Sequence, residues 1–418
     1  MCDILVRMAE QGRKTIGVMV EITREFGRDL CKGIAAFAGE HDDVSPVFIT
    51  PNMLKRRSEL ARFDGFIVRV MNGAMARTLA ATRKPVVDVY YERPYGGFAI
   101  VKTNHAKVGQ LAAAHFIAHQ FKNFAFCGFA GGRFSDYCRQ AFVNALKRGG
   151  FSCRDYTPAA RTRYEFDPAV LINERMEPAP DATALKEWVL SLERPVAVFC
   201  PNDLRAWQLL QVCLDAGLRV PHDVAILGLD NDALICGFSK PALSSIDPDT
   251  ESIGREAMRT IGEMMDRPAV SRKPIVRQVP PKGVVVRTST ETYPVDPPWL
   301  SDALVFIRRH VADRLSAVDV YRKTGLSHTV VDATFRSRLG RSVQKEIAAA
   351  RLEKAKHLLA SGNSSVSEIA KASGFASAEY FIRAFNAAFG QSPSRWRASG
   401  GGRNMSASPT RHTSPTRF

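Results

Sequence analysis

Residues Ile369 to Arg397 read IAKASGFASAEYFIRAFNAAFGQSPSRWR, and this stretch decides the fold of the C-terminal part of the chain. Gly374 ends a short helical pattern. Ser377 then precedes a second one, where its hydroxyl can accept a hydrogen bond from a free backbone N–H. Two helices joined by a glycine-containing turn form the helix-turn-helix layout, whose second helix enters the major groove of DNA. The stretch therefore predicts a DNA-binding module.

The same pattern occurs a second time, earlier in the chain. The matching positions are Gly325-Leu326-Ser327 with Gly374-Phe375-Ala376-Ser377, Val331 with Phe381, Phe335 with Phe385, and Gly340 with Gly390. Between the copies, residues 343–361 have the apolar spacing of one long amphipathic helix. Strand patterns stop after residue 298, so we predict an all-α double helix-turn-helix domain over residues 299–398. Phe335, Phe381 and Phe385 are expected in its core.

This duplicated module resembles the AraC/XylS-type transcription regulators. The resemblance rests on Ile369-Ala370, Gly374-Phe375, Ser377, Tyr380-Phe381, Arg383, Phe385, Gly390, Ser392-Pro393 and Trp396-Arg397, and on Arg351-Leu352, Ala355 and Leu358-Leu359 in the connecting helix. It implies double-stranded operator DNA as partner, with two reading helices in successive major-groove segments on one face of the DNA.

The resemblance also assigns individual DNA contacts by position. It implies base contacts from His328, Thr329 and Asp332 in the first copy and from Ala378, Glu379, Ile382 and Arg383 in the second, and phosphate contacts from Arg336, Arg338 and Lys345. The alternative for each is an exposed helix residue that touches nothing. The copies differ where Tyr321 replaces Ala370 and where Ala333 replaces Arg383, so we expect the first copy to pack differently or to make fewer contacts.

The charge distribution agrees with a polyanionic partner. The net charge is +16, and residues 300–418 hold 19 Lys and Arg against 8 Asp and Glu, which places +11 of it there. A basic excess on one folded module favours nucleic acid, because each neutralised phosphate releases counterions. A merely solvated basic surface is the alternative explanation of the charge alone.

The first part of the chain has a different pattern of apolar residues. With 418 residues the chain is long enough for two or three domains. From residue 14 to 288 short apolar runs alternate with amphipathic stretches, which is typical of βα units and a parallel sheet. Clear strand candidates are residues 15–20, 65–70, 85–89, 124–128, 196–200 and 224–229. We expect an N-terminal tail over residues 1–13, an α/β domain over 14–288, a linker over 289–298, and a disordered basic tail over 399–418.

Polar side chains follow two of the predicted strands. Asn202 and Asp203 come after one strand and open a helix, and Asp230 comes at the end of another. Ligands of open α/β sheets gather at the carboxyl ends of strands. Carboxylates and amides there can bind the adjacent hydroxyl groups of a polyol. The alternative is helix capping by Asn202 or Asp203 and turn formation around Asp230.

The α/β part resembles the effector domain of lac-repressor-type regulators. The resemblance rests on Thr103-Asn104, Gly109, Ala112-Ala113, Pro201-Asn202-Asp203, Ala206, Cys213, Gly217, Val220-Pro221, Asp223 to Gly228, Asp230-Asn231, Leu243 to Ile246 and Gly254. It implies the two-lobed fold of periplasmic sugar-binding proteins. It also implies sugar contacts from Arg139, Asn202 or Asp203, and Asp230, together with Asn104, where the family has an aspartate.

The domain order carries a further resemblance. Only about 13 residues precede the first predicted strand, so we expect no lac-type DNA-binding head there. A sensor followed by an AraC-type module is the order of the xylose-operon regulators. That resemblance implies D-xylose as effector, whereas the pocket chemistry alone indicates a small polyhydroxylated ligand.

Other classes of site lack their motifs. The eight cysteines form no C-x-x-C pair, so neither a metal site nor a disulfide framework is expected. The glycines at residues 128–132 fit neither G-x-G-x-x-G nor a P-loop, and no catalytic pattern is recognisable, so no cofactor is expected. No run is long enough for a membrane span, and the start has no signal-peptide core.

We therefore expect a cytoplasmic, sugar-gated transcription regulator. It would be an activator that dimerises through the sensor domain and contacts RNA polymerase. The alternatives are a sugar-metabolising enzyme fused to a DNA-binding module, an exported solute receptor, a repressor, and a regulator that responds to another ligand. The missing catalytic pattern argues against the enzyme, and the basic module argues against the receptor.

Overall fold

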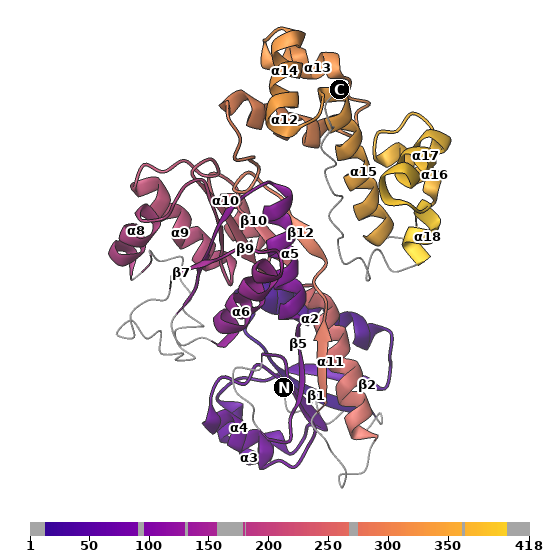
Figure 1. Ribbon diagram of the computed structural model, residues 1–418. Coiled ribbons are helices and arrows are strands. Elements are labelled where there is room, and N and C mark those ends of the chain that lie inside the picture. The colour runs from indigo at the N-terminus through magenta and orange to yellow at the C-terminus, as the bar shows by residue number, and fades with distance from the viewer. Residues whose placement is uncertain are drawn as a thin grey trace. The chain divides into compact units, whose positions relative to one another are not determined.

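The computed structural model describes residues 13–90, 96–129, 133–156, 179, 181–266, 275–361 and 364–398. The predicted tail 399–418 and residues 1–12 of the predicted N-terminal tail lie outside these ranges. The chain divides into two compact units, residues 1–294 and 295–418 (Figure 1). The first is α/β and the second is helical, which confirms the predicted fold class.

The first lobe of the N-terminal unit is built on a six-stranded parallel sheet with the order β11-β5-β4-β3-β1-β2. The strands are β1 (Lys14–Met19), β2 (Val44–Phe48), β3 (Gly65–Val68), β4 (Val86–Asp88), β5 (Ala99–Thr103) and β11 (Val276–Val279). The helices are α2 (Glu25–Gly39), η1 (Met53–Lys55), α3 (Arg57–Leu60), α4 (Gly73–Ala80) and α11 (Thr250–Met265). The inner strands are buried on both faces, which explains their continuous apolar runs.

Helices α2 and α11 pack against each other at two glycines. A Cβ on Gly33 would lie 1.9 Å from the Glu251 carbonyl oxygen, and one on Gly254 would lie 2.1 Å from that of Leu30. Both distances are too short for any side chain. Glycine at these positions lets α11, which comes late in the sequence, complete one face of the first sheet.

The second lobe has its own six-stranded sheet, with the order β12-β10-β9-β8-β6-β7. The strands are β6 (Asn123–Cys127), β7 (Arg154–Tyr156), β8 (Val196–Phe199), β9 (Val224–Leu229), β10 (Ser244–Asp247) and β12 (Gly283–Val285), of which β12 is antiparallel to β10. The helices are α5 (His105–Ala118), α6 (Arg133–Arg148), α8 (Ala182–Leu190), α9 (Asp203–Asp215) and α10 (Ala233–Phe238). Apolar clusters on both faces of the sheet form the core of this lobe.

Three segments connect the two lobes. They are the step from β5 into α5 at Asn104, the step from β10 into α11 at residues 248–249, and the step from β11 to β12 at residues 280–282. The segments are bonded to one another, because the Asn104 N–H donates to the Val279 carbonyl at 2.8 Å and the Lys282 N–H donates to the Asp247 carbonyl at 2.9 Å. Short crossovers of this kind are typical hinges for lobe closure.

The C-terminal unit contains the duplicated module. Its helices are α12 (Pro298–His310), α13 (Ala317–Thr324), α14 (His328–Leu339), α15 (Val343–Ser361), α16 (Val366–Ala372), α17 (Ala378–Phe389) and α18 (Pro393–Ala398). Ser327 caps α14 and Ser377 caps α17, as predicted. Both helices end at glycines in the left-handed conformation, Gly340 at φ 70° and Gly390 at φ 69°.

The core of this unit is aromatic. Phe335, Phe381 and Phe385 have no exposed surface, which confirms their predicted place. Around Phe385 the rings of Phe389 and Trp396 lie 4.5 and 5.9 Å away, measured between ring centres. These contacts hold α17 and α18 together and fix the orientation of α17.

Candidate functional site

Asn202 and Asp203 lie at the carboxyl end of β8, where α9 begins. The Asn202 side chain caps α9 by accepting from the Arg205 N–H at 2.9 Å. The Asp203 carboxylate is enclosed, with 1% of the residue exposed. It accepts from the Asp232 N–H at 2.7 Å and from the Ser245 hydroxyl at 2.5 Å. Asp203 therefore ties the end of β8 to the segment after β9 and to β10.

Burial raises the pKa of Asp203 to about 7. The Asp232 carboxylate adds to this rise, while the hydrogen bonds from Ser245, the Asp232 N–H and Cys236 oppose it. Gly228 leaves the space for the carboxylate, since a Cβ there would lie 2.1 Å from Asp203 Oδ1.

The 230–232 loop, formed by Asp230, Asn231 and Asp232, follows β9. Asp230 has φ 107° and Asn231 has φ 53°, two consecutive residues in a backbone region that side chains disfavour. The Asp230 N–H donates to the Ile246 carbonyl at 3.1 Å, and the Asn231 N–H donates to the Ser245 hydroxyl at 3.0 Å. Strained, fixed loops of this kind cluster at ligand sites.

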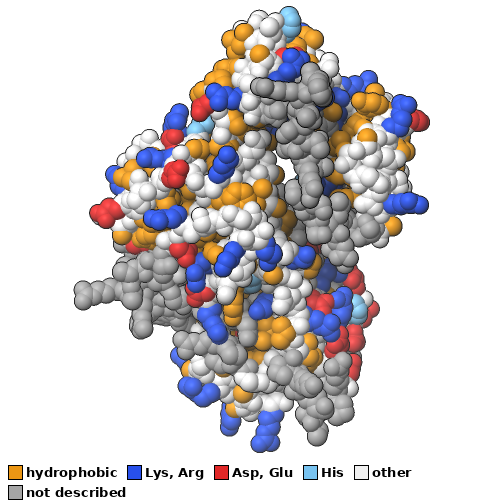
Figure 2. Space-filling view, viewed as in Figure 1, with side chains coloured by type: hydrophobic (Ala, Val, Ile, Leu, Met, Phe, Trp, Pro, Cys, Tyr) orange, Lys and Arg blue, Asp and Glu red, His pale blue; other side chains and the backbone are white. Residues whose placement is uncertain are grey.

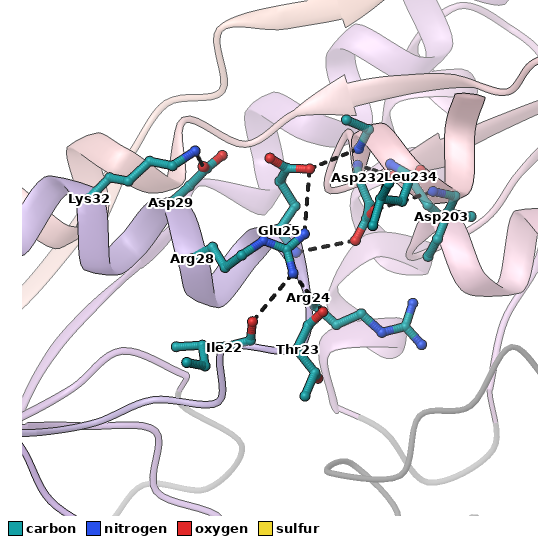
Figure 3. A network of polar contacts seen from close by, with 12 residues as sticks. Ile22, Thr23, Arg24, Glu25, Arg28, Asp29, Lys32, Asp203, Asp232 and Leu234 are labelled. Atoms are coloured by element: carbon teal, nitrogen blue, oxygen red, sulfur yellow. Dashed lines mark hydrogen bonds and ion pairs between the residues drawn. The ribbon is translucent and has the colours of Figure 1, made fainter. Parts of the chain in front are cut away.

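The 230–232 loop also contacts the first lobe (Figure 3). The Glu25 N–H at the start of α2 donates to Asp232 Oδ2 at 3.2 Å, and the Ala233 N–H donates back to Glu25 Oε2 at 2.9 Å. Asp232 Oδ1 meanwhile caps α10 by accepting from the Leu234 N–H at 3.1 Å. Glu25 thus donates to Asp232 and accepts from Ala233 across the two lobes.

The first lobe contributes a polar cluster that our sequence analysis missed. Arg69 follows β3, and its guanidinium lies 3.5 Å from the Glu21 carboxylate and 4.1 Å from the centre of the Tyr90 ring. Glu21 follows β1 and Tyr90 follows β4, so all three stand at carboxyl ends of strands. The rule that identified Asn202 and Asp230 would have found them, had it been applied to the first sheet.

Of the other two predicted effector residues, Asn104 directly follows β5 and so stands at the same end of the first sheet as Glu21, Arg69 and Tyr90. Asn104 is in the first crossover and caps α5 by accepting from the Lys107 N–H at 3.1 Å. Arg139 on α6 donates to Asp155 on β7 at 3.0 Å, in an ion pair whose side chains are 42% and 33% exposed. The structure therefore brings Asn202, Asp203 and Asp230 together at one sheet end.

In the C-terminal unit, residues 331–340 and 381–390 have the same order of buried and exposed positions. His328 and Thr329 on α14 and Glu379 and Arg383 on α17 are exposed, while Ala378 and Ile382 are partly buried. Arg336, Arg338 and Lys345 are exposed as well. Val330 and Tyr380, which the sequence analysis did not name as DNA contacts, are 48% and 50% exposed at matching positions of the two helices.

Asp332 differs from the other predicted base contacts, because its carboxylate is engaged within the unit. Oδ1 accepts from the Val343 N–H at the start of α15 at 3.2 Å, and Oδ2 accepts from the Tyr321 hydroxyl at 3.3 Å. Arg336 lies 3.8 Å away on the same helix. Tyr321 thus explains the expected difference in packing between the copies, since it joins α13 to α14 through Asp332.

The basic side chains do not form one continuous patch on the face drawn in Figure 2. The Lys and Arg side chains coloured there are dispersed. Among the described residues, no group of His, Cys, Asp and Glu is placed to hold a metal ion. No helix in the same ranges is long and apolar enough to cross a membrane.

Comparison with known proteins identifies both units. A model described as a periplasmic binding protein-like domain matches residues 113–290, and one described as a helix-turn-helix domain matches residues 320–399. The xylose operon regulatory protein of Escherichia coli K12 is 24% identical over 92% of this chain and 97% of its own length. That of Haemophilus influenzae is 23% identical over 93% and 99%.

A solved structure has the same two-part fold. The structure of a xylose-binding transcription activator matches with a TM-score of 0.56 and 22% identity, over 93% of this chain and 98% of that one. The chain is a homologue of the xylose operon regulatory proteins, with a periplasmic-binding-protein-like domain followed by an AraC-type helix-turn-helix domain.

Proposed function

We propose that this transcription regulator activates an operon for the use of D-xylose or a related sugar, with D-xylose as its effector. The observation that carries the proposal is the strained 230–232 loop at the sheet end of a hinged, two-lobed unit, in a chain that also carries two helix-turn-helix copies. The relatives named for xylose regulation span nearly the whole chain, which supports this effector.

Asp230 and Asn202 are the proposed sugar contacts of the second lobe, and Glu21 and Arg69 those of the first. Asp203 acts by holding the 230–232 loop, because its carboxylate is enclosed and already accepts two hydrogen bonds. Asn104 acts by capping α5 in the first crossover between the lobes. Arg139, which donates to Asp155 through Nη1, remains a proposed sugar contact.

For DNA, His328, Thr329, Glu379 and Arg383 are the proposed base contacts. Ala378 and Ile382 offer apolar surface to a thymine methyl group. Arg336, Arg338 and Lys345 are the phosphate contacts. Asp332 positions α14 rather than reading a base, since both of its oxygens accept hydrogen bonds inside the unit.

Sugar binding would work by shifting an equilibrium. A sugar held by residues of both lobes stabilises the closed arrangement by its differential affinity for that state. The protein would act in the cytoplasm, as a homodimer that contacts RNA polymerase, and would not chemically convert the sugar.

Thermal unfolding with D-xylose, L-arabinose, D-ribose and D-glucose tests the proposal. A sugar at 100 times its Kd raises the free energy of unfolding by about 2.7 kcal/mol. We expect a rise in Tm with D-xylose that is absent in Asp230→Ala. If none of the four sugars shifts the Tm of the wild-type protein, the effector assignment is wrong, while the DNA-binding assignment stands.

A further inference from the structure

The segment that leaves the sensor is fixed to it by buried hydroxyl groups. We name residues 287–293, which follow β12 and precede the second unit, the exit strap. Ser289 and Thr290 in it have no exposed surface. The Ser289 hydroxyl donates to the Ile226 carbonyl at 2.6 Å and accepts from the Ser244 N–H at 2.8 Å. The exit strap is thus part of the sensor fold and is not an extended connector.

Arg287 joins the exit strap to the 230–232 loop. One of its guanidinium nitrogens donates to Asn231 Oδ1 at 2.8 Å, and another donates to the Leu243 carbonyl at 2.9 Å. Asn231 stands between the proposed sugar contact Asp230 and the interlobe contact Asp232. A displacement of the loop must therefore stretch the Arg287–Asn231 hydrogen bond or move the strap.

The 230–232 loop also contacts the first lobe, through Glu25. The two hydrogen bonds between Glu25 and residues 232–233 join segments 207 and 208 residues apart in sequence. Arg28 holds the Glu25 carboxylate from the next turn of α2, with 3.7 Å between its Nη2 and Glu25 Oε2. Figure 3 shows this group at the meeting of the two lobes. If the lobes open, the Ala233 N–H loses its carboxylate partner.

We propose that these contacts form a relay from lobe closure to the exit strap. The Glu25–Asp232 pair forms when the lobes close, and the Arg287–Asn231 hydrogen bond passes the position of the loop to the strap, from which the chain continues into the DNA-binding unit. Glu25 and Arg287 are positioning residues in this scheme. The relay rests on the proposed function, because it assumes that the effector drives closure.

The relay assigns different defects to its two ends. Glu25→Ala removes the carboxylate that accepts from the Ala233 N–H, whereas the backbone N–H of residue 25 can still donate to Asp232. Fewer molecules are then closed, so the apparent Kd for D-xylose should rise roughly ten-fold. Arg287→Met keeps the length of the side chain but removes its donors. It should leave the Kd for D-xylose within about two-fold of wild type, while the change in operator affinity caused by the sugar falls toward none.

Asn231 gives a second pair of variants at the same contact. Asn231→Gly accepts the left-handed backbone and removes the acceptor, so it should uncouple sugar from DNA as Arg287→Met does. Asn231→Asp keeps an acceptor and tolerates this backbone, so it should retain the coupling. Glu40→Ala and Arg277→Met are the controls. They break ion pairs with Arg255 and Glu263 inside the first lobe and should change neither quantity.

The experiment measures D-xylose binding by calorimetry and operator binding by fluorescence anisotropy, on full-length folded variants. If Arg287→Met and Asn231→Gly leave the sugar-induced change in operator affinity as in wild type, the relay is refuted. The same holds if Glu25→Ala leaves the Kd for D-xylose unchanged.

A sugar-free measurement separates failure of the relay from failure of the proposed function. The Ser289 N–H donates to the Ala242 carbonyl at 2.9 Å, so its hydrogen exchange reports on strap order. Without sugar a minor fraction of the molecules is still closed, because the effector only shifts an existing equilibrium. Glu25→Ala should lower that fraction and accelerate exchange in residues 287–293, and Glu40→Ala should not. Equal exchange in both variants overturns the relay whatever the effector, whereas a wild-type protein that ignores D-xylose overturns only the effector assignment.

Discussion

Replacing Asp203 by Asn should flatten the pH dependence of stability. The pKa of Asp203 lies at about 7, against an ordinary 3.8, because the carboxyl group is buried. The folded protein therefore holds this proton more tightly than the unfolded chain does. The resulting stability is fully present below about pH 4 and is lost as the pH rises to about 7. The whole difference amounts to roughly 4 kcal/mol.

Between pH 5 and pH 8 the wild-type protein should lose about 3 kcal/mol through this group, and Asp203→Asn should not. The assay is urea unfolding of the N-terminal unit, followed by circular dichroism at four pH values across this range. The amide can still accept one of the two hydrogen bonds that Asp203 accepts from Ser245 and the Asp232 N–H. We therefore expect the variant to fold and to lose the same amount of unfolding free energy at every pH tested.

Asp223→Asn is the matched control in the same lobe. The ion pair with Arg219 lowers the pKa of Asp223. The contribution of Asp223 to stability therefore changes with pH only at acid pH, below the range tested. Its curve should run parallel to that of the wild type. Parallel curves for wild type and Asp203→Asn as well would refute the argument, because they would mean that Asp203 is ionised throughout.

Three further predictions concern the DNA-binding unit. Arg383→Ala should weaken operator binding by about 1–3 kcal/mol with little effect on random DNA, whereas Lys345→Ala should weaken both alike and lower the salt slope by about one, as measured by anisotropy titrations over a salt series. Asp332→Ala leaves the Val343 N–H and the Tyr321 hydroxyl without their acceptor, so the free energy of unfolding of the C-terminal unit should fall by about 1–3 kcal/mol. Loss of operator affinity with unchanged stability would restore Asp332 as a base contact. Phe385→Ala should lower the free energy of unfolding of the C-terminal unit by about 3–5 kcal/mol. In calorimetry, only the transition temperature of that unit should fall. An unchanged transition would contradict its place in the core.

The strands that could be predicted from sequence have two buried faces, although the inner strand β5, which is also mostly buried, was missed. The runs in β1, β3, β4, β6, β8 and β9 are apolar because helices cover both sides of them. The edge strands β2, β7 and β11 carry Pro46, Asp155 and Gln278, which break the apolar pattern. Strand β10 reads Ser-Ser-Ile-Asp, because its serines bind Asp203 and the exit strap instead of apolar neighbours.

The residues of the candidate site divide in the same way. Those that follow a predicted strand could be inferred from sequence, and those whose contacts lie far apart in the sequence could not. Asn202, Asp203 and Asp230 follow predicted strands, so their shared sheet end could be inferred. The Arg287–Asn231 and Glu25–Asp232 contacts join residues 56 and 207 positions apart, and no periodicity encodes such pairs. Likewise, Tyr321 was recognisable as a departure from the second copy, but its hydrogen bond to Asp332 required the three-dimensional arrangement.

The late return of α11 and β11 to the first lobe has a consequence for synthesis on the ribosome. Until residues 250–279 have emerged, strand β5 lacks its second neighbour, β11, and the apolar side chains of α2, such as Leu30 and Ile34, lack the helix that covers them. The first lobe therefore cannot mature ahead of the second, although it begins first. Both lobes become stable in one late step, shortly before the DNA-binding helices are translated, and a nascent chain arrested before residue 250 should need protection from aggregation.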